Sequence, residues 1–466
     1  MYIERIRGKN VVVVDMTHGG MELCDSYSRY GANVTAVDVH GTLKKEELAC
    51  LSASSIPVFK TFNDALVTAD PHLVTMQYSP NREDITQFCG EEGIPLLTHA
   101  RATGLILSDM LGKCRIVEIT GAYGKTTTVT HLESILVRDG EESMVMSSKG
   151  VKVVEGDNVR ILDGNGSITP AYALKAVRIT RESGYNPKNY VFEISLGGLG
   201  IGSVCAVLGV PLHLRVGVNR SSFFSKAQMA QYIRPTSVLC LNGDDDPTRR
   251  MEMMAPSKTN MFSVEGDGNV VADKKALNPD TGRLTIDVSN LSTVKGNQID
   301  TTMEFSPNRS YFGRSAVSNF LAAASIALSM NMDELSIVEG LEKSVPPDNR
   351  LVASNRCGCT IISSTATSKE TIDNAIVEAK DYAELTRRRL SLLIGGLSKT
   401  TCGKVDFDGL SSMLKCHILD GRNVALYGEL GSEMAKRGCN APMFSTKDEA
   451  TDSITEEEGV IISCTN

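Results

Sequence analysis

The stretch ITGAYGKTTTVT, residues 119–130, places a Gly-Lys-Thr sequence directly after a run of apolar residues. Lys125 has the length to reach the outer phosphates of a nucleotide. The backbone amides of Gly124, Lys125 and Thr126 come at the start of an expected helix, where the helix dipole favours an anion, and the Thr126 hydroxyl is a potential Mg²⁺ ligand. The usual phosphate loop has a glycine five positions before the second one, and this chain has Ile119 there. The sequence therefore predicts a shortened triphosphate-binding loop.

The residues on either side of this loop supply the context that such a loop needs. The sequence CRIVEIT, residues 114–120, predicts a buried strand. After the loop, Val129, Leu132 and Leu136 share one helical face, and Gly140 is placed to end that helix. A glycine-rich turn with a chance lysine is the alternative, and the order of strand, turn and helix disfavours it.

The rest of the chain predicts an α/β protein of three domains, 1–113, 114–345 and 346–466. In the first, VVVVDM and NVTAVDV read as strands with a helix between them, and the turn THGG lacks the G-x-G-x-x-G pattern of dinucleotide binding. A helix is expected over 318–330. After the linker SVPPDNR, residues 344–350, strand and helix patterns alternate again.

The overall composition excludes several classes of protein. The chain has 466 residues, 41% hydrophobic and 22% charged, as in a soluble globular protein. Its net charge of -8 argues against nucleic acid as a partner. The N-terminus does not resemble a secretion leader, and the 12 cysteines are scattered, so we expect reduced thiols and a cytoplasmic location. Residues 194–214 are uncharged over a membrane-spanning length, but their glycines and Pro211 predict buried core instead.

The pattern T-G-x-x-G-K-T-T-T after a strand resembles the ATP loop of the Mur ligase superfamily. The resemblance implies a Rossmann-like N-terminal substrate domain, a P-loop ATPase central domain and a Rossmann-like C-terminal domain. It also implies ATP and Mg²⁺ as cofactors. The loop residues implied to bind ATP are Gly121, Gly124, Lys125, Thr126 and Thr127.

Further segments resemble the superfamily in the same order along the chain. VFEISLGG resembles its glutamate motif, which implies that Glu193 binds Mg²⁺ together with Thr126; a buried carboxylate needs a cation in any case. LNGDDDP and FGRSAVSN resemble nucleotide-binding segments, and Arg350 matches an arginine that faces the phosphates. The resemblance therefore implies catalytic roles for Lys125, Glu193 and Arg350. It adds these residues near the nucleotide: Asn242, Asp245, Asp246 and Asn319.

Three segments depart from the superfamily's pattern. After Asn219 the expected Asp-His-Leu-Asp is replaced by RSSFF, and Ala316 stands where the helix-start motif has its first asparagine. The third domain has SSTA, residues 363–366, in place of Asp-Tyr-Ala-His. A second metal ion and part of the ATP contact are therefore not predicted for this chain.

The superfamily's chemistry implies activation of a carboxylate as an acyl phosphate. The patterns D-x-T-H-G-G and A-V-D-V-x-G-T, at 15–20 and 36–42, resemble a divergent branch found in methanogens. The substrate implied for that branch is a nickel tetrapyrrole carboxylate, whose last carbocyclic ring is closed. We expect no membrane partner, and the oligomeric state is not predicted. The candidate substrate-binding residues are Thr17, His18, Gly19, Gly20, His99, Arg101 and Arg220.

Two other functions remain open at this point. One is an amide ligase that adds an amino acid to a carboxylate, as in a pseudomurein-type precursor. It would be recognised by ATP hydrolysis that depends on an added amine. The other is a protein of the same fold that only binds or carries a cofactor.

Overall fold

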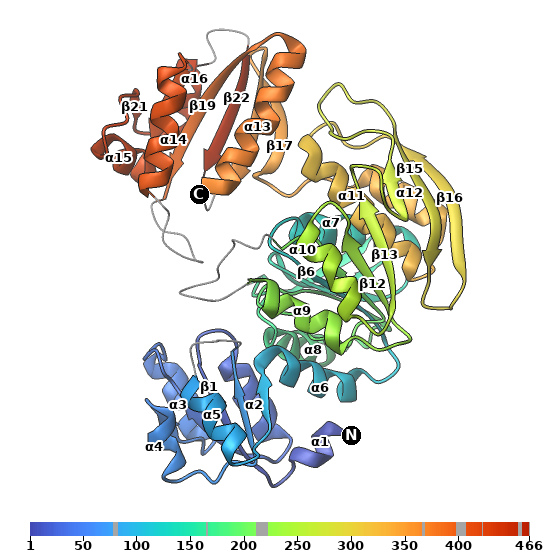
Figure 1. Cartoon of the computed structure of the whole chain (residues 1–466), viewed down its shortest axis with the longest axis vertical. Coiled ribbons are helices and arrows are strands. Elements are labelled where there is room, and N and C mark those ends of the chain that lie inside the picture. The colour runs from blue at the N-terminus through green and yellow to red at the C-terminus, as the bar shows by residue number, and fades with distance from the viewer. Residues whose placement is uncertain are drawn as a thin grey trace. The chain divides into compact units, whose positions relative to one another are not determined.

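The computed structural model describes residues 1–77, 83–164, 166–210, 222–365, 369–397, 407–421, 423–454 and 459–465. The chain divides into two compact units. The first comprises Met1–Val271, Asp287–Met303 and Leu321–Gly340, and the second Ala272–Ile286, Glu304–Phe320 and Leu341–Asn466. The α/β class predicted from the sequence is confirmed, with three sheets (Figure 1). The predicted domain boundaries near residues 113 and 345 remain predictions.

The first sheet is parallel, with the order β3-β2-β1-β4-β5. The strand order reverses between β1 and β4, and ligands of open α/β sheets bind at the carboxyl ends of the strands at such a point. The elements of this part are α1 (Tyr2–Ile6), β1 (Asn10–Val14), α2 (Gly20–Arg29), β2 (Asn33–Val37), α3 (Lys45–Ala53), β3 (Val58–Phe59), α4 (Phe62–Leu66), β4 (Leu73–Met76), α5 (Glu83–Glu91), β5 (Leu96–Thr98) and α6 (His99–Leu111).

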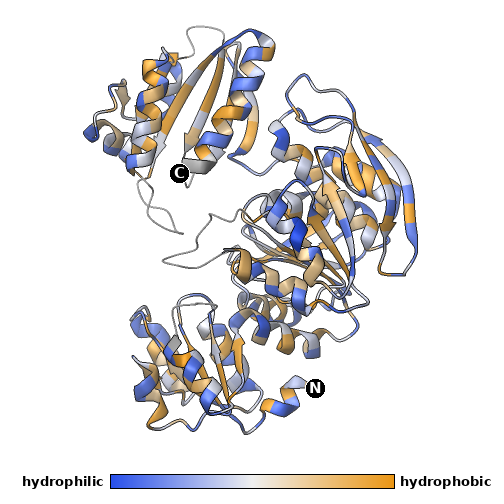
Figure 2. Cartoon of the chain, viewed as in Figure 1, coloured by the Kyte–Doolittle hydropathy of each residue, from blue (hydrophilic) through white to orange (hydrophobic). Residues whose placement is uncertain are grey.

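Alternating valines on β1 divide this sheet between two cores. Val12 and Val14 pack with α4 and α5 on one face, whereas Val11 and Val13 belong to the core on the other face. That second core is continuous from α2 and α6 to α8 (Tyr172–Glu182) and to Tyr190 of β10 (Asn189–Glu193) in the central sheet. Figure 2 shows the hydrophobic residues concentrated in the strands. The first sheet and the central sheet are therefore joined through common apolar packing.

The central sheet places β6 among parallel neighbours. Its order includes β14-β13-β12-β11-β6-β10-β7-β8-β9, and β8 and β9 extend the β7 edge in antiparallel fashion. The elements as far as β14 are β6 (Arg115–Thr120), α7 (Lys125–Asp139), β7 (Ser143–Ser147), β8 (Gly150–Glu155), β9 (Asn158–Asp163), α8 (Tyr172–Glu182), β10 (Asn189–Glu193), β11 (Val204–Val207), α9 (Ser222–Tyr232), β12 (Val238–Asn242), α10 (Asp246–Arg249), the 3-10 helix η1 (Arg250–Met254), β13 (Lys258–Ser263) and β14 (Val270–Ala272). They are followed by β15 (Leu284–Ser292), β16 (Gln298–Phe305), α11 (Gly313–Ser329) and α12 (Glu334–Lys343).

The third sheet, in the second unit, has the order β17-β18-β22-β19-β20-β21. Only its β17–β18 pairing is antiparallel among the registers described. The elements are β17 (Arg350–Arg356), β18 (Cys359–Thr365), α13 (Lys369–Thr386), β19 (Arg389–Gly396), α14 (Phe407–Leu419), β20 (Asn423–Tyr427), α15 (Gly428–Lys436), β21 (Met443–Phe444), α16 (Lys447–Ile454) and β22 (Gly459–Thr465).

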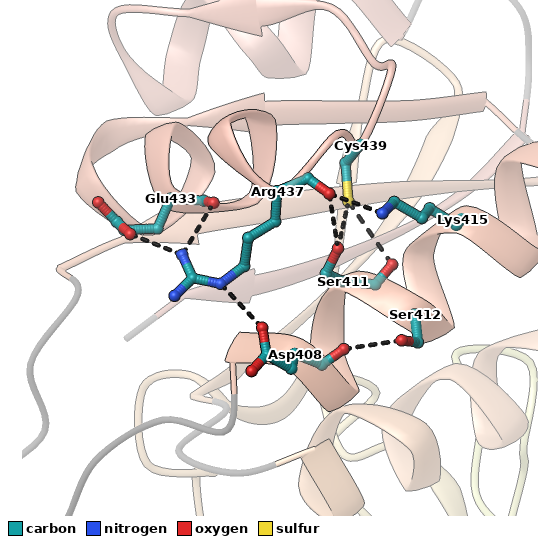
Figure 3. A network of polar contacts seen from close by, with 7 residues as sticks. All are labelled: Asp408, Ser411, Ser412, Lys415, Glu433, Arg437 and Cys439. Carbon is teal, nitrogen blue, oxygen red and sulfur yellow. Dashed lines mark hydrogen bonds and ion pairs between the residues drawn. The ribbon is translucent and has the colours of Figure 1, made fainter.

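Polar contacts fix the end of α15 against α14 in this unit (Figure 3). Arg437 bonds both Glu433 and Asp408, and its carbonyl oxygen accepts a bond of 2.6 Å from Lys415 Nζ. The buried Cys439 thiol lies 3.4 Å from the Ser411 hydroxyl. These contacts are local to one corner, so they explain packing and not chemistry.

No helix in the described ranges is both long and apolar enough to cross a membrane. The uncharged stretch from Ile194 to Val210 lies mostly in buried positions around β11, as the sequence predicts. Its last residues, 211–214, lie outside the described ranges.

Candidate active site

The Gly-Lys-Thr loop joins the carboxyl end of β6 to the first turn of α7. Gly124 and Gly121 have φ angles of 79° and 150°, which favour glycine. A Cβ at Gly121 would lie 3.1 Å from that of Leu208. The Ala122 amide donates to the Gly209 carbonyl at 2.7 Å. Both the backbone angles and the neighbouring segment 208–209 therefore require the glycine-rich form of the loop.

Lys125 closes over this loop. Its Nζ donates to the carbonyl oxygens of Gly121, at 3.0 Å, and Ala122, at 3.4 Å. The N-cap residue of α7 is Gly124, whose lack of a side chain leaves the helix start without a side-chain cap. The arrangement brings an ammonium group and the positive end of a 15-residue helix together, as an anionic phosphate requires.

An oxygen cluster forms where α7 meets the ends of β7 and β10. Glu193 Oε1 accepts a hydrogen bond of 2.8 Å from the Thr126 hydroxyl, which is itself 3.0 Å from the Ser148 hydroxyl. The Ser148 amide donates to Glu193 Oε2 at 3.0 Å. The sequence motifs pointed to Thr126 and Glu193 but not to Ser148, which becomes a neighbour because β7 pairs with β10.

The donor set of this cluster fits Mg²⁺. Glu193 is 1% exposed, and its carboxylate accepts hydrogen bonds from two uncharged groups, the Thr126 hydroxyl and the Ser148 amide. A carboxylate buried in this way needs a cation, and hydroxyl and carboxylate oxygens are what a small hard cation prefers. No group of three or more His, Cys, Asp or Glu side chains with metal-site geometry occurs among the described residues. Mg²⁺ generally takes few protein ligands and keeps water and phosphate oxygens.

A second lysine lies close to the loop, and the sequence motifs did not reveal it. Lys226 on α9 is 2% exposed, and its Nζ bonds the Ser222 hydroxyl at 3.1 Å. Burial, with the positive charge of Lys125 nearby, lowers the pKa of Lys226 to about 7. Two amines near one loop make this a place where an anion is strongly favoured.

Glu118 on β6 fixes the glycine-rich segment that follows Glu193. Its carboxylate is fully buried and accepts four backbone N–H bonds, from residues 199–202, at 2.6 to 3.1 Å. Burial raises the pKa of Glu118, and these four donors act in the opposite direction. Because both oxygens already accept two N–H bonds each, we take the group to be ionised in the fold. Glu118 is therefore a structural residue.

Two of the residues around the end of β12 that were predicted to bind nucleotide contact segment 208–210, which in turn contacts the Lys125 loop. Asn242 Nδ2 donates to the Leu208 carbonyl at 2.8 Å, and Asp245 Oδ2 accepts from the Val210 amide at 2.8 Å. Both side chains therefore support the 208–210 segment that touches the loop. Asp246 is exposed and pairs with Arg249 and Arg250. Their roles toward ATP remain predictions.

The other predicted residues of the nucleotide side lie elsewhere in the chain. Asn319 is nearly buried within α11, and Arg350 is exposed at the first position of β17; both belong to the second unit. Arg220, predicted to bind substrate, and the departing residue Asn219 lie outside the described residues. Thr127 is buried in the first turn of α7.

At the switch point of the first sheet, polar residues gather around Asp15. Its carboxylate accepts bonds from the Thr17 amide, at 2.9 Å, and from the Thr17 hydroxyl, and it lies 3.7 Å from His40 Nε2. Burial opposes ionisation, but the Thr17 bonds and the nearby His99 and His40 hold the pKa of Asp15 below its usual value. Asp15 also has a φ of 76°, a backbone strain that recurs at functional sites.

The candidate substrate residues His18 and His99 lie at the same place. Burial lowers the pKa of His99 to about 4, and the charges of Asp15 and His18 also act on it. The His18 carbonyl accepts a bond of 2.9 Å from Gln77, at the end of β4. Arg101 is placed differently, because its guanidinium carbon lies 4.3 Å from the ring centroid of Tyr232.

Two glycines make the loop after β1 fit against the central sheet. A Cβ on Gly20 would lie 2.4 Å from the Asp15 carbonyl oxygen, and one on Gly19 would lie 2.7 Å from the Cβ of Ala171. Ala171 follows the 167–170 segment, in which the Ile168 carbonyl accepts from the Ser195 amide at 2.8 Å. Ser195 is two residues from Glu193, so a short chain of contacts connects the first sheet to the oxygen cluster.

Comparison with known proteins gives relatives of one kind. No family model matches the chain. Coenzyme F(430) synthetase of Methanosarcina acetivorans is 30% identical over 243 residues, 50% of each chain, so the alignment spans only about half of that relative. UDP-N-acetylmuramoylalanine--D-glutamate ligase of Tropheryma whipplei is 23% identical over 443 residues, 91% of this chain and 84% of the relative.

A solved structure supports the same assignment for the fold. MurF from Acinetobacter baumannii superposes with a TM-score of 0.57 at 16% identity, covering 98% of this chain and 90% of that one. The collinear motifs, the lysine loop above an oxygen cluster and these matches all agree. In sequence and in fold the chain is therefore similar to ligases of the Mur superfamily.

Proposed function

We propose that the protein is an ATP-dependent ligase that activates a carboxylate of a nickel tetrapyrrole seco-acid and closes a carbocyclic ring, as the name coenzyme F(430) synthetase implies. The observation that carries the ligase part is the oxygen cluster of Glu193, Thr126 and Ser148 beside the Lys125 loop. The match to the Methanosarcina protein supports the substrate class.

The reaction proceeds in two steps. The substrate carboxylate attacks the γ-phosphorus of ATP, which gives an acyl phosphate and ADP. A carbon of the same molecule, after losing a proton, then attacks the acyl carbon, and inorganic phosphate leaves as the carbon–carbon bond forms. Because the nucleophile belongs to the substrate, its proximity is supplied intramolecularly and no separate amine has to be captured.

Each element of the site has a part in these steps. Lys125 and the start of α7 hold the outer phosphates and offset the charge that develops during transfer. Mg²⁺, held by Thr126, Glu193 and, on this geometry, Ser148, would supply Lewis-acid neutralisation of the phosphate oxygens. We also expect Arg350 to help neutralise the negative charge on the phosphate oxygens. We expect the protein to act in the cytoplasm.

The test is incubation of the purified chain with ATP, Mg²⁺ and the nickel seco-acid, followed by mass and absorption spectra and phosphate release. Lys125→Ala and Glu193→Gln are expected to lower kcat by roughly 10²–10³-fold. Lys258→Ala and Glu155→Gln, at exposed positions of β13 and β8, are matched controls and should leave it unchanged. A wild-type chain that releases no phosphate with the seco-acid contradicts the proposal.

An amide ligase is the second candidate, and a specific observation favours it. The D-glutamate ligase aligns along 91% of this chain, far more than the 50% aligned with the synthetase. Phosphate release that appears only when an amino acid is added would establish this alternative. A chain that binds ATP without turnover of any acid would instead support a carrier.

A further inference from the structure

Exposed aromatic rings are concentrated on two elements of the first unit. Across the described ranges, three aromatic side chains are classed as exposed: Phe224, at 56%, and Tyr232 and Tyr123, at about 40%. Tyr123 belongs to the Lys125 loop, and the other two are on α9. A large apolar side chain left in water is unfavourable, so a group of them beside a site points to a ligand.

The α9 aromatics share one side of their helix. Phe224, Gln228 and Tyr232 are spaced by four, so they form a single stripe. Gln228 Oε1 accepts a bond of 2.9 Å from Thr98, and Tyr232 stacks against Arg101, so the stripe faces the start of α6.

The order of these two contacts gives the direction of the helices. The earlier residue of α9 meets Thr98 and the later one meets Arg101, so α6 and α9 run in the same direction. Phe224 therefore projects one turn, ~5.4 Å, beyond Gln228 toward the N-terminal ends of both helices. Thr98 is the last residue of β5, which places Phe224 at the carboxyl edge of the first sheet.

Polar groups of the site lie on both sides of α9, which carries the Phe224 ring. The carboxyl edge of the first sheet carries Asp15 and His99, and the opposite side of α9 carries Lys226, near Lys125. Phe223, half-buried on the α9 core, meets the Phe224 ring edge-on at 5.4 Å and 79°, which holds the ring's orientation.

We propose that Phe224 is an apolar stacking surface for one face of the substrate's nickel tetrapyrrole macrocycle. The inference rests on the proposed function, because it names the residue that recognises a tetrapyrrole. A macrocycle seated on Phe224 has a flat apolar face and carboxylate arms at its rim. Arg101 of α6, which lies over the ring of Tyr232 two turns along α9 from Phe224, supplies a cation for one arm, and another arm reaches the Lys125 loop past the start of α9.

The test measures binding separately from turnover. Nickel seco-tetrapyrrole and uroporphyrin, a nickel-free tetrapyrrole polycarboxylate, are titrated into the full-length protein, and binding is followed by absorption. Phe224→Ala is expected to raise Kd for both by roughly 10-fold or more, the size of a lost aromatic stacking partner. Phe224→Trp should restore binding to within about two-fold, and Met253→Ala, which shortens a side chain 90% exposed elsewhere, should change nothing.

The outcomes separate this inference from the function on which it rests. Unchanged tetrapyrrole binding in Phe224→Ala, with normal wild-type cyclisation, overturns the stacking role and leaves the function standing. A wild-type chain that binds neither tetrapyrrole overturns both. A Phe224→Ala variant whose KM rises for ATP and not for the tetrapyrrole assigns the ring to adenine and also overturns the inference. Thermal unfolding of each variant checks that it is folded.

Discussion

The fold strongly changes the ionisation of Lys226. Its pKa falls from about 10.5 to about 7 because it is buried near Lys125. The unfolded chain therefore binds more protons than the folded chain between these pH values, and stability rises with pH across that window. Below pH 7 both states are protonated, and the destabilisation is constant.

Lys226→Met tests this directly. Replacing a buried charge by an apolar side chain of similar length is expected to stabilise the ligand-free protein by about 1–4 kcal/mol at pH 7. It should also flatten the rise in stability between pH 7 and pH 10. Urea unfolding at several pH values measures both effects. A Lys226→Met variant that is less stable than wild type at pH 7 without ligand would contradict this prediction, because it would show that the bond to Ser222 outweighs the cost of burying the ammonium.

Two buried histidines determine how the stability of the fold changes at acidic pH. Burial lowers the pKa of His99 to about 4 and that of His131 to about 3. Each binds a proton in the unfolded chain near pH 6.5 and stays neutral in the fold, so stability falls as the pH drops from about 6.5 toward these values. His131→Leu should remove about one proton from the slope of stability against pH. An unchanged slope contradicts the prediction.

Glu118 stabilises the fold through the four hydrogen bonds that its carboxylate accepts from backbone N–H groups. In Glu118→Gln the side chain can accept at one oxygen only, so two backbone donors lose their partner. Each unsatisfied buried group costs about 1–3 kcal/mol, and we expect a loss of about 2–4 kcal/mol. Denaturant unfolding measures the loss, with the exposed Glu155→Gln as the matched control. A loss no larger than that of the control would contradict this role.

At the scale of elements, α6 packs closely against the glycine-rich segment that follows Glu193. A Cβ at Gly104 would lie 2.4 Å from the Leu199 carbonyl oxygen, whereas one at Gly90 in α5 would meet nothing within 4 Å. Gly104→Ala is therefore expected to destabilise by about 1–3 kcal/mol. Gly90→Ala should be neutral or stabilising, because alanine favours a helix. Equal effects of the two substitutions in thermal unfolding would contradict the packing described.

The elements also explain what the sequence predicted well and what it missed. The strand, loop and helix around Lys125 follow one another directly in the chain, so the local sequence pattern was sufficient to predict them. Ser148 joins Glu193 only because β7 and β10 are neighbours in the sheet, although 45 residues separate the two side chains. Lys226 is buried by the packing of α9, which no short pattern encodes. The nucleotide roles of Asn319 and Arg350 came from resemblance alone and stay predictions.

At the scale of the molecule, the first two sheets form one packing unit. The core that includes Val13 continues to Tyr190, so β1 and β6 are expected to open together. Hydrogen exchange of the intact chain should give their slowest amides similar free energies of opening, with β19 of the second unit free to differ. Much faster exchange of β1 than of β6 would contradict the shared core.

The joined core limits how this protein can acquire a new specificity. A recognition domain held by a flexible linker can be exchanged between relatives by recombination at that linker. Here a crossover near residue 113 would cut through packed side chains and separate Gly19 from Ala171. Changes of substrate should therefore accumulate as point substitutions around an unchanged scaffold, and engineered chimaeras should carry residues 1–271 as a single block.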